Sequence, residues 1–229
     1  MRVVFLLDFD NTLSDNDLAR ERLAATTLKI LGPDLSRDLW MTYERVRDAL
    51  GFVDFPGTLG RFHAEHPEVP DDPIDRVVLD FPYAEVRYAD TLHVLAALWR
   101  VGTVVVLSDG DRTFQPLKIS RSGVYEAARG NVLVFPHKER DLDHVLRLFP
   151  AERYVAVDDK AAVLARIKMH WGERVRTVHV LQGKYADDPY SGPPPDATIA
   201  RIGDLVGLVG TADALRAFTQ GASIRGRLA

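Results

Sequence analysis

The sequence has no cysteine among its 229 residues. Disulfide-based scaffolds, thiolate metal sites and cysteine nucleophiles are therefore excluded. It also lacks any uncharged run that approaches the roughly 20 apolar residues of a membrane-spanning helix, and it shows no internal repeat. Asp8 interrupts the opening MRVVFLLD too early for a secretory signal. We therefore expect a cytoplasmic protein with no membrane partner.

An excess of positive charge is also missing. The 29 Lys and Arg residues against 33 Asp and Glu residues give a formal net charge of −4. Proteins that bind nucleic acid usually have a basic excess, so this balance argues against a nucleic-acid partner. The length allows one large domain, or a core with a smaller inserted domain. Composition gives no prediction of the oligomeric state.

Short segments rich in β-branched residues recur along the chain. They lie at 3–7, 103–108, 131–135, 153–157 and 174–181. The first four are nearly continuously apolar, which is typical of parallel strands that are buried on both faces. Amphipathic helical patterns separate the later segments, at 90–102, 140–150 and 160–172. The alternation predicts an α/β fold, a Rossmann-like doubly wound parallel sheet with helices on both faces.

The region between residues 15 and 89 breaks this alternation. Three amphipathic patterns, at 17–32, 39–51 and 72–81, follow one another with no convincing strand between them. We therefore predict an inserted α-helical cap at 15–89 and a core made of 1–14 and 90–229.

Polar residues follow the predicted strands at the point where each one ends. They are Asp8, Asp10, Asn11 and Thr12, then Ser108, Asp109 and Gly110, then Lys138, and finally Asp158 and Asp159. In an open parallel sheet, ligands bind outside the carboxyl ends of the strands. Each group alone is typical of a turn or a helix cap. Their joint occurrence at successive strand ends favours a shared site.

The chemistry of such a set is that of phosphoryl transfer. Converging carboxylates repel one another unless a hard cation neutralises them, and oxygen ligands suit Mg²⁺. One carboxylate could attack a phosphate ester and form an aspartyl-phosphate. A second could protonate the leaving oxygen and later deprotonate water. A hydroxyl and an ammonium group would stabilise the phosphoryl oxygens as charge develops on them.

The four clusters, in this order, resemble the four motifs of the haloacid dehalogenase-like (HAD) hydrolase superfamily. The segment DFDNT matches its Asp-x-Asp-x-Thr motif, and VAVDDK matches its acidic fourth motif. The match spans residues 3 to about 160, with the helical segment where a type-1 cap is inserted. A Gln and a Lys after the second motif, in FQPLKISRSG, also match the pattern that the superfamily shows there.

The resemblance implies roles for individual residues. Asp8 would be the nucleophile and a magnesium ligand, and Asp10 the general acid/base, with its backbone carbonyl on the metal. Ser108 and Lys138 would hold the phosphoryl group. Lys118 is an alternative to Lys138, but Lys138 follows a predicted strand and opens a helix, as the third motif requires.

The remaining motif residues would complete the site. The resemblance places Thr12, Asp109 and Gly110 at the substrate, with Thr12 shaping its loop. In the acidic fourth motif, either Asp158 or Asp159 ligates the metal directly, with Asp159 the better match.

The residue type at position 10 distinguishes the reactions of this superfamily from one another. Haloacid dehalogenases need no second acid, because a halide leaves without protonation, and ion pumps carry threonine instead. A phosphonate hydrolase would need a cap lysine, and nothing marks Lys29 for that role. We therefore expect a magnesium-dependent phosphatase acting on a small-molecule phosphate ester. The alternatives are a sugar-phosphate mutase or phosphotransferase, and a non-catalytic binding protein on the same fold.

The sequence does not identify the leaving group of the substrate. A second anionic group could contact cap residues, namely Arg45, Arg47, Arg61, His63 and His66, but a solvated helix face and loop is the favoured interpretation. Trp40 and Tyr43 are expected to pack rather than to recognise a ligand. The Pro-rich loop 182–196 could approach the site, although a surface connection is favoured. The last residues, 221–229, are expected to fray.

Overall fold

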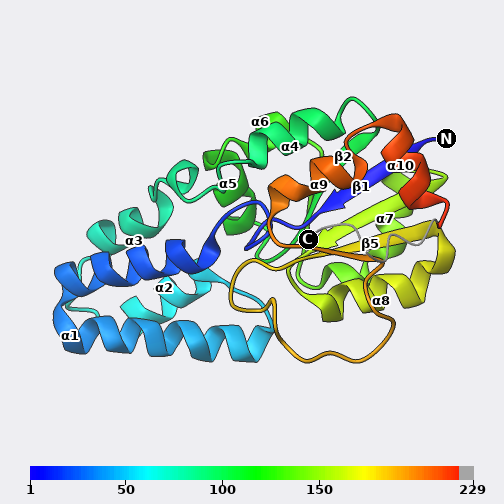
Figure 1. Cartoon of the computed structure of the whole chain (residues 1–229). Helices are drawn as coiled ribbons and strands as arrows, with labels where there is room; N and C mark the ends of the chain where they lie inside the picture. Colours follow the sequence, from blue (N-terminus) through cyan, green and yellow to red (C-terminus); the bar gives the residue numbers. More distant parts are fainter. Residues whose placement is uncertain (222–229) are drawn as a thin grey trace.

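The structure of the protein is a computed structural model that describes residues 1–221. The expected fraying at 221–229 therefore falls, apart from Gly221, outside the described residues. Six strands form one sheet in the order β3-β2-β1-β4-β5-β6, and every pair is parallel (Figure 1). The strands are β1 (Val3–Leu7), β2 (Thr103–Asp109), β3 (Val132–Phe135), β4 (Arg153–Asp158), β5 (Val175–Val180) and β6 (Ala197–Ile199). The predicted doubly wound parallel sheet is confirmed.

Helices cover both faces of the sheet (Figure 1). Because side chains alternate along a strand, Phe5 and Leu7 of β1 face one apolar layer, and Val4 and Leu6 face the other. The first layer is closed by α4 (Thr91–Leu98), α5 (Phe114–Arg121), α6 (Val124–Ala127), α9 (Leu205–Val209) and α10 (Ala212–Thr219). The second is closed by α7 (Leu142–Leu148) and α8 (Ala161–Trp171). Burial on both faces explains why the strands read as continuous apolar runs.

Four α-helices lie between β1 and β2, and the first three of them form a separate lobe (Figure 1). The lobe consists of α1 (Asn16–Leu50), α2 (Phe55–Glu65) and α3 (Asp71–Leu79). Leu39, Phe62 and Ile74, one from each helix, belong to an apolar cluster distinct from the two layers of the sheet. The predicted helical insertion is confirmed, while its limits at residues 15 and 89 stay a prediction.

The helical patterns at 17–32 and 39–51 form two helical segments of α1, separated by the non-helical backbone of Gly32 (φ 76°), as the sequence predicts. The insertion differs from the sequence expectation in one further helix. Helix α2 was not predicted, because one Pro and two Gly residues obscure its pattern. Its buried Phe55, Leu59 and Phe62 nevertheless recur at the i, i+4 and i+7 spacing of a helix.

Helix α4 begins after Asp90, which occupies its N-cap position without a capping hydrogen bond through the side chain. Val94, Leu95 and Leu98 are buried against the sheet, whereas Leu92 is 39% exposed.

Four short 3₁₀ segments complete the described chain, at Tyr83–Glu85, Lys138–Arg140, Gly172–Arg174 and Ile202–Asp204. None of the helices in residues 1–221 combines the length and the apolar character that a membrane span requires.

Strand β6 is joined to β5 through Asp196, which precedes it. The carboxylate of Asp196 accepts hydrogen bonds from Thr177 N (2.8 Å), Lys168 Nζ (3.0 Å) and Arg176 Nη1 (3.0 Å). Burial raises the pKa of Asp196, but the bond from the Thr177 backbone and the neighbouring cations outweigh it and leave the pKa below its usual 3.8.

We therefore expect Asp196→Asn to destabilise the fold by about 1–3 kcal/mol at pH 7, as for a lost charge-assisted hydrogen bond. A lowered carboxyl pKa stabilises the fold above the unfolded-state value, and this contribution is lost as the pH falls below 3.8 through the folded-state value. The difference between wild type and variant should thus shrink between pH 5 and the acid limit of folding, as measured by urea unfolding. An undiminished difference would assign the effect to packing.

Candidate active site

Three buried aspartates meet at the carboxyl ends of β1 and β4. Asp8 follows β1, and its amide donates to the Val157 carbonyl (2.9 Å), which continues the pairing with β4. Asp158 ends β4, and Asp159 comes directly after it. One oxygen from each of these carboxylates lies within 4.8 Å of the others. The structure thus brings together the two acidic motifs, which are about 150 residues apart in sequence.

Lys138 places a buried ammonium group among these carboxylates. Its Nζ contacts Asp8 Oδ1 and lies 2.7 Å from Asp158 Oδ2, with the side chain only 2% exposed. Its backbone amide donates to Asp109 Oδ1 (2.7 Å), which ties the end of β2 to the segment after β3. Lys138 opens a short 3₁₀ segment rather than the expected α-helix, because α7 begins only at Leu142.

The site holds several buried charged groups close together. Burial raises the pKa of Asp8 and of Asp159, and the nearby Asp158 raises both further. Burial also lowers the pKa of Lys138, but Asp158 and Asp8 outweigh it and hold that pKa well above its ordinary value. Lys160, directly after Asp159, is a second cation near these groups, so two ammonium groups stand against three carboxylates. A further cation among the carboxylates would be favourable.

The donor atoms at this position fit a magnesium ion. Both carboxylate oxygens of Asp159 are buried, and within residues 1–221 neither has a hydrogen-bond partner. Asp158 differs, because its Oδ1 accepts from Lys160 N (2.8 Å) and its Oδ2 pairs with Lys138. An all-oxygen set with unused lone pairs suits Mg²⁺. Asp8 and Asp159 are the carboxylates best placed to bind the ion.

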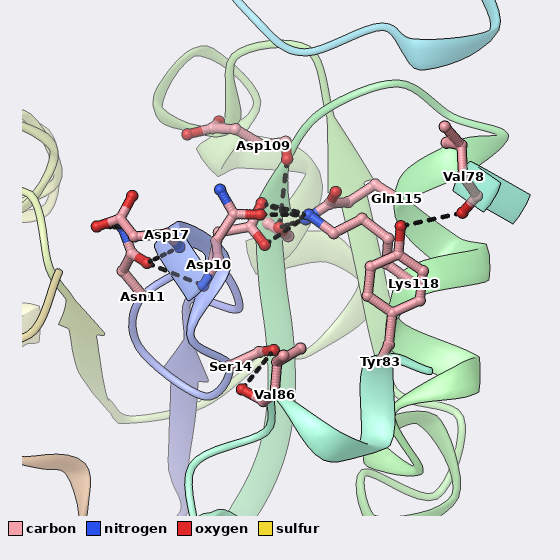
Figure 2. A network of polar contacts seen from close by, with 12 residues as sticks. Asp10, Asn11, Ser14, Asp17, Val78, Tyr83, Val86, Asp109, Gln115 and Lys118 are labelled. Carbon is pink, nitrogen blue, oxygen red and sulfur yellow. Dashed lines mark hydrogen bonds and ion pairs between the residues drawn. The ribbon is translucent and has the colours of Figure 1, made fainter. Parts of the chain in front are cut away.

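Asp10 faces Lys118 and Gln115 of α5 (Figure 2). Its carboxylate lies 2.7 and 3.0 Å from Lys118 Nζ, and it accepts from Gln115 Nε2 (3.0 Å). Lys118 is buried and also donates to Asn16 Oδ1 (3.0 Å), at the start of α1. The side chain of Asp10 therefore lies outside the three-aspartate cluster, so it would serve a metal only through its backbone carbonyl.

The sequence assigns no role to Gln115 and considers Lys118 only as an alternative to Lys138, although both belong to the pattern after the second motif. They stand three residues apart on α5, so both side chains share one helix face. Gln115 Nε2 also donates to Ser108 Oγ (2.9 Å), which joins Ser108 to Asp10 through one amide. The two lysines of the sequence analysis thus have separate partners: Lys138 contacts Asp8, and Lys118 contacts Asp10.

The remaining predicted residues lie around the same centre. Thr12 is buried, and its hydroxyl has no hydrogen-bond partner within residues 1–221. The Gly110 amide donates to the Phe135 carbonyl (3.0 Å), so this amide is already used within the protein. Gly110 has φ 145°, and a Cβ there would approach Gln115 to 3.0–3.3 Å. Gly110 therefore shapes the loop after β2.

A cleft of about 680 Å³ opens above this centre, between the sheet and α1. Asp10, Asp109 and Asp159 are among its lining residues, on the side of the sheet. Residues of α1 and of the 182–196 loop also line it, among them Arg20, Tyr43, Arg47, Lys184, Tyr185 and Asp188. The favoured interpretation of this loop as a mere surface connection was therefore wrong.

Five cap residues were candidates for binding a second anionic group. Within residues 1–221, only Arg47 of these five lines the cleft. The others have carboxylate neighbours elsewhere in the cap or lie outside the cleft: Arg45, Arg61, His63 and His66. Tyr43 packs on Phe55 with ring centroids 5.1 Å apart, as expected, but it also lines the cleft.

Magnesium is expected to stabilise the protein through Asp159. Saturation at about a hundred times the dissociation constant adds about 2.7 kcal/mol, equivalent to a Tm rise of about 5–10 °C for a chain of this size. Asp159→Asn should lose most of that rise. In EDTA the same variant should be at least as stable as wild type, because it removes one of three converging carboxylates. Thermal unfolding with MgCl₂ and with EDTA measures both effects, and an equal rise in wild type and variant would rule out Asp159 as a ligand.

Comparison with known proteins identifies the family. No family model matches the chain, and no curated protein matches it. A solved structure described as a "putative haloacid dehalogenase-like hydrolase", from Burkholderia xenovorans LB400, is 42% identical, with 93% of this chain and 98% of that chain covered and a TM-score of 0.85.

Two more distant structures share the fold. The HAD-hydrolase YfnB from Bacillus subtilis, bound to magnesium, is 14% identical over 92% of this chain and 99% of its own, with a TM-score of 0.61. The defluorinating L-2-haloacid dehalogenase Rha0230 is 14% identical over 90% and 94%, with a TM-score of 0.65. With the four motifs at the strand ends and the 42% identity over nearly the whole chain, these findings show that the protein belongs to the haloacid dehalogenase-like (HAD) hydrolase superfamily.

Proposed function

We propose that the protein is a magnesium-dependent phosphatase that hydrolyses a small phosphate monoester through an aspartyl-phosphate on Asp8. The observation that carries this proposal is the second carboxylate in the cleft. Asp10 lines the cleft two residues after Asp8, and Lys118 and Gln115 hold its side chain in place. Hydrolysis of an ester needs such a group, because an alkoxide leaves only when it is protonated.

In the first step, an oxygen of Asp8 bonds to phosphorus, and the bond from phosphorus to the leaving oxygen breaks. Protonated Asp10 gives its proton to that oxygen, so the alcohol leaves neutral. In the second step, Asp10 takes a proton from water, whose oxygen bonds to phosphorus while the acyl-phosphate bond breaks. Asp8 is regenerated, and inorganic phosphate is released.

The other residues act on charge and geometry. The ammonium of Lys138, already beside Asp8, and the hydroxyl of Ser108 stabilise the phosphoryl oxygens. Asp8, Asp159 and the Asp10 carbonyl would hold magnesium, with Asp158 beside them pairing Lys138. Magnesium, when bound, would supply positive charge that offsets the repulsion between Asp8 and the phosphoryl group. The magnesium reported for YfnB supports this assignment.

A dehalogenase is the alternative that the fold neighbours raise, since Rha0230 is one. A halide leaves without a proton, so the bond-breaking first step of that reaction has no use for an acid at Asp10. The site therefore favours phosphate ester hydrolysis over carbon–halogen cleavage.

Two assays on wild type and Asp10→Asn test the proposal. We expect phosphate release from p-nitrophenyl phosphate with MgCl₂, none with EDTA, and no chloride release from 2-chloropropionate. Asp10→Asn should slow hydrolysis by about 10²–10⁴-fold. The loss should be larger for glycerol phosphate, because an alkoxide needs the proton more than nitrophenolate does. Chloride release, or phosphate release that persists in EDTA, would overturn the proposal.

A further inference from the structure

The cations of the cleft fall into two groups. Arg20 and Arg47 of α1 both pair with Glu44, Arg47 also pairs with Asp48 (3.3 Å), and Arg166 pairs with Glu139 (2.9 Å). Their charges are balanced within the protein, so they offer little to a ligand. Lys160 and Lys184 behave differently, since neither makes an ion pair within 4.0 Å in the part of the chain that the structure describes.

Both of these lysines lie against one aromatic ring. The Nζ atoms of Lys160 and Lys184 are each 5.0 Å from the ring centroid of Tyr185. Lys160 is on the floor of the cleft, directly after Asp159, whereas Lys184 and Tyr185 come from the loop after β5. The ring and the two ammonium groups thus form one surface, which we call the Tyr185 cluster (Lys160, Lys184 and Tyr185).

The loop that carries the cluster is fastened to the catalytic loop. Lys184 N donates to Asp17 Oδ2 (2.8 Å), and Asn11 Nδ2 contacts the same oxygen (3.4 Å). Gly183 has φ 71° and packs so closely on Asn11 that a Cβ there would overlap the Asn11 side chain. Figure 2 shows Asn11 and Asp17 beside Asp10. The cluster therefore stands at a defined position relative to Asp8 and Asp10.

The two lysines differ in the acidic groups around them. The three aspartates of the floor act on Lys160, which directly follows Asp159. Lys184 has an exposed side chain; the Asp17 carboxylate accepts from its amide, and Asp188 lines the same cleft, but within residues 1–221 the Lys184 ammonium makes no ion pair with either. Lys184 is therefore the cation of the cluster that is more available to a ligand.

We propose that the leaving group of the substrate carries a second anionic group, a carboxylate or a phosphate, which the Tyr185 cluster binds. This inference rests on the proposed function, because the first anionic group is the phosphoryl group at Asp8. The substrate would be a small, doubly anionic phosphate ester. Its second anion would contact Lys184 and Lys160, and its carbon skeleton would lie against the Tyr185 ring.

Binding of three non-hydrolysable phosphonates tests this in the presence of MgCl₂. Propylphosphonate carries one anionic group, 3-phosphonopropionate adds a carboxylate, and propane-1,3-bisphosphonate adds a second phosphonate. Isothermal titration should show at least one doubly anionic ligand binding wild type about tenfold more tightly than propylphosphonate, as for one added charge-assisted contact. The doubly anionic ligand that binds more tightly identifies the second group as a carboxylate or a phosphate.

Lys184→Gln should remove most of that preference, and Lys29→Gln is the matched control. Lys184 and Lys29 are both exposed, so neither change threatens the fold, but Lys29 lies on α1 outside the cleft. Lys29→Gln should keep the full preference. Equal affinity of wild type for all three ligands, or a preference that survives Lys184→Gln, would overturn the inference.

This test separates the inference from the proposed function, since phosphonate binding needs no turnover. Preferential binding without any phosphate release from p-nitrophenyl phosphate would contradict the phosphatase and retain the Tyr185 cluster as an anion site. Phosphate release without preferential binding would retain the phosphatase and contradict the cluster.

Discussion

Asp8→Asn is expected to lower the turnover of p-nitrophenyl phosphate by about 10³-fold or more, as for loss of a covalent nucleophile. An amide oxygen is a poor nucleophile, and the substitution also removes a charge that Lys138 contacts. The measurement is the initial rate of phosphate release at saturating substrate and MgCl₂. Circular dichroism of the variant would check that the sheet is intact.

A neutral control for Asp8→Asn is Asp213→Asn. The Asp213 side chain is 94% exposed on α10, and the same chemical change there should leave the rate unaltered. Turnover that persists in Asp8→Asn at more than about a tenth of the wild-type rate, well above the loss expected for a nucleophile, would place the nucleophile elsewhere and contradict the mechanism.

Lys138→Met is expected to cost about 3–5 kcal/mol of unfolding free energy in metal-free protein at pH 7, as when one partner of a buried ion pair is removed. The change leaves Asp8 and Asp158 buried without the ammonium that contacts both. Urea unfolding in EDTA measures the loss. Added MgCl₂ should recover part of it, because a bound cation would take over some of the missing charge.

The comparison for Lys138→Met is Lys118→Met, which removes another buried lysine. Its partner Asp10 has 29% of its side chain exposed, so water can solvate the carboxylate that is left behind. The loss should accordingly be smaller than at Lys138. Equal losses at the two positions would show that burial of the lysine, rather than the charge of the aspartate cluster, determines the cost.

The sequence alone was sufficient for the core of the fold and for the position of the acidic motifs. The central strands β1, β2, β4 and β5 are buried on both faces, so their apolar residues are consecutive in sequence. Five strands were predicted to within one residue at either end. Parallel strands present their carboxyl ends at one edge of the sheet, so Asp8, Asp158 and Lys138 could be expected to meet there. The strand positions and the edge at which the motifs meet can therefore be predicted from local burial and sheet geometry, without knowledge of contacts between distant residues.

Other features depended on tertiary packing. The packing of α5 against the loop after β1 determines which lysine contacts Asp8 and which contacts Asp10. Lys118 and Asp10, for example, are 108 residues apart in sequence. The loop after β5 could not be assigned to the site from its prolines and glycines, because its position rests on the contact of Gly183 with Asn11 and on the bond from Lys184 to Asp17. Such contacts join residues that have no periodic relation in sequence, so only the folded chain specifies them.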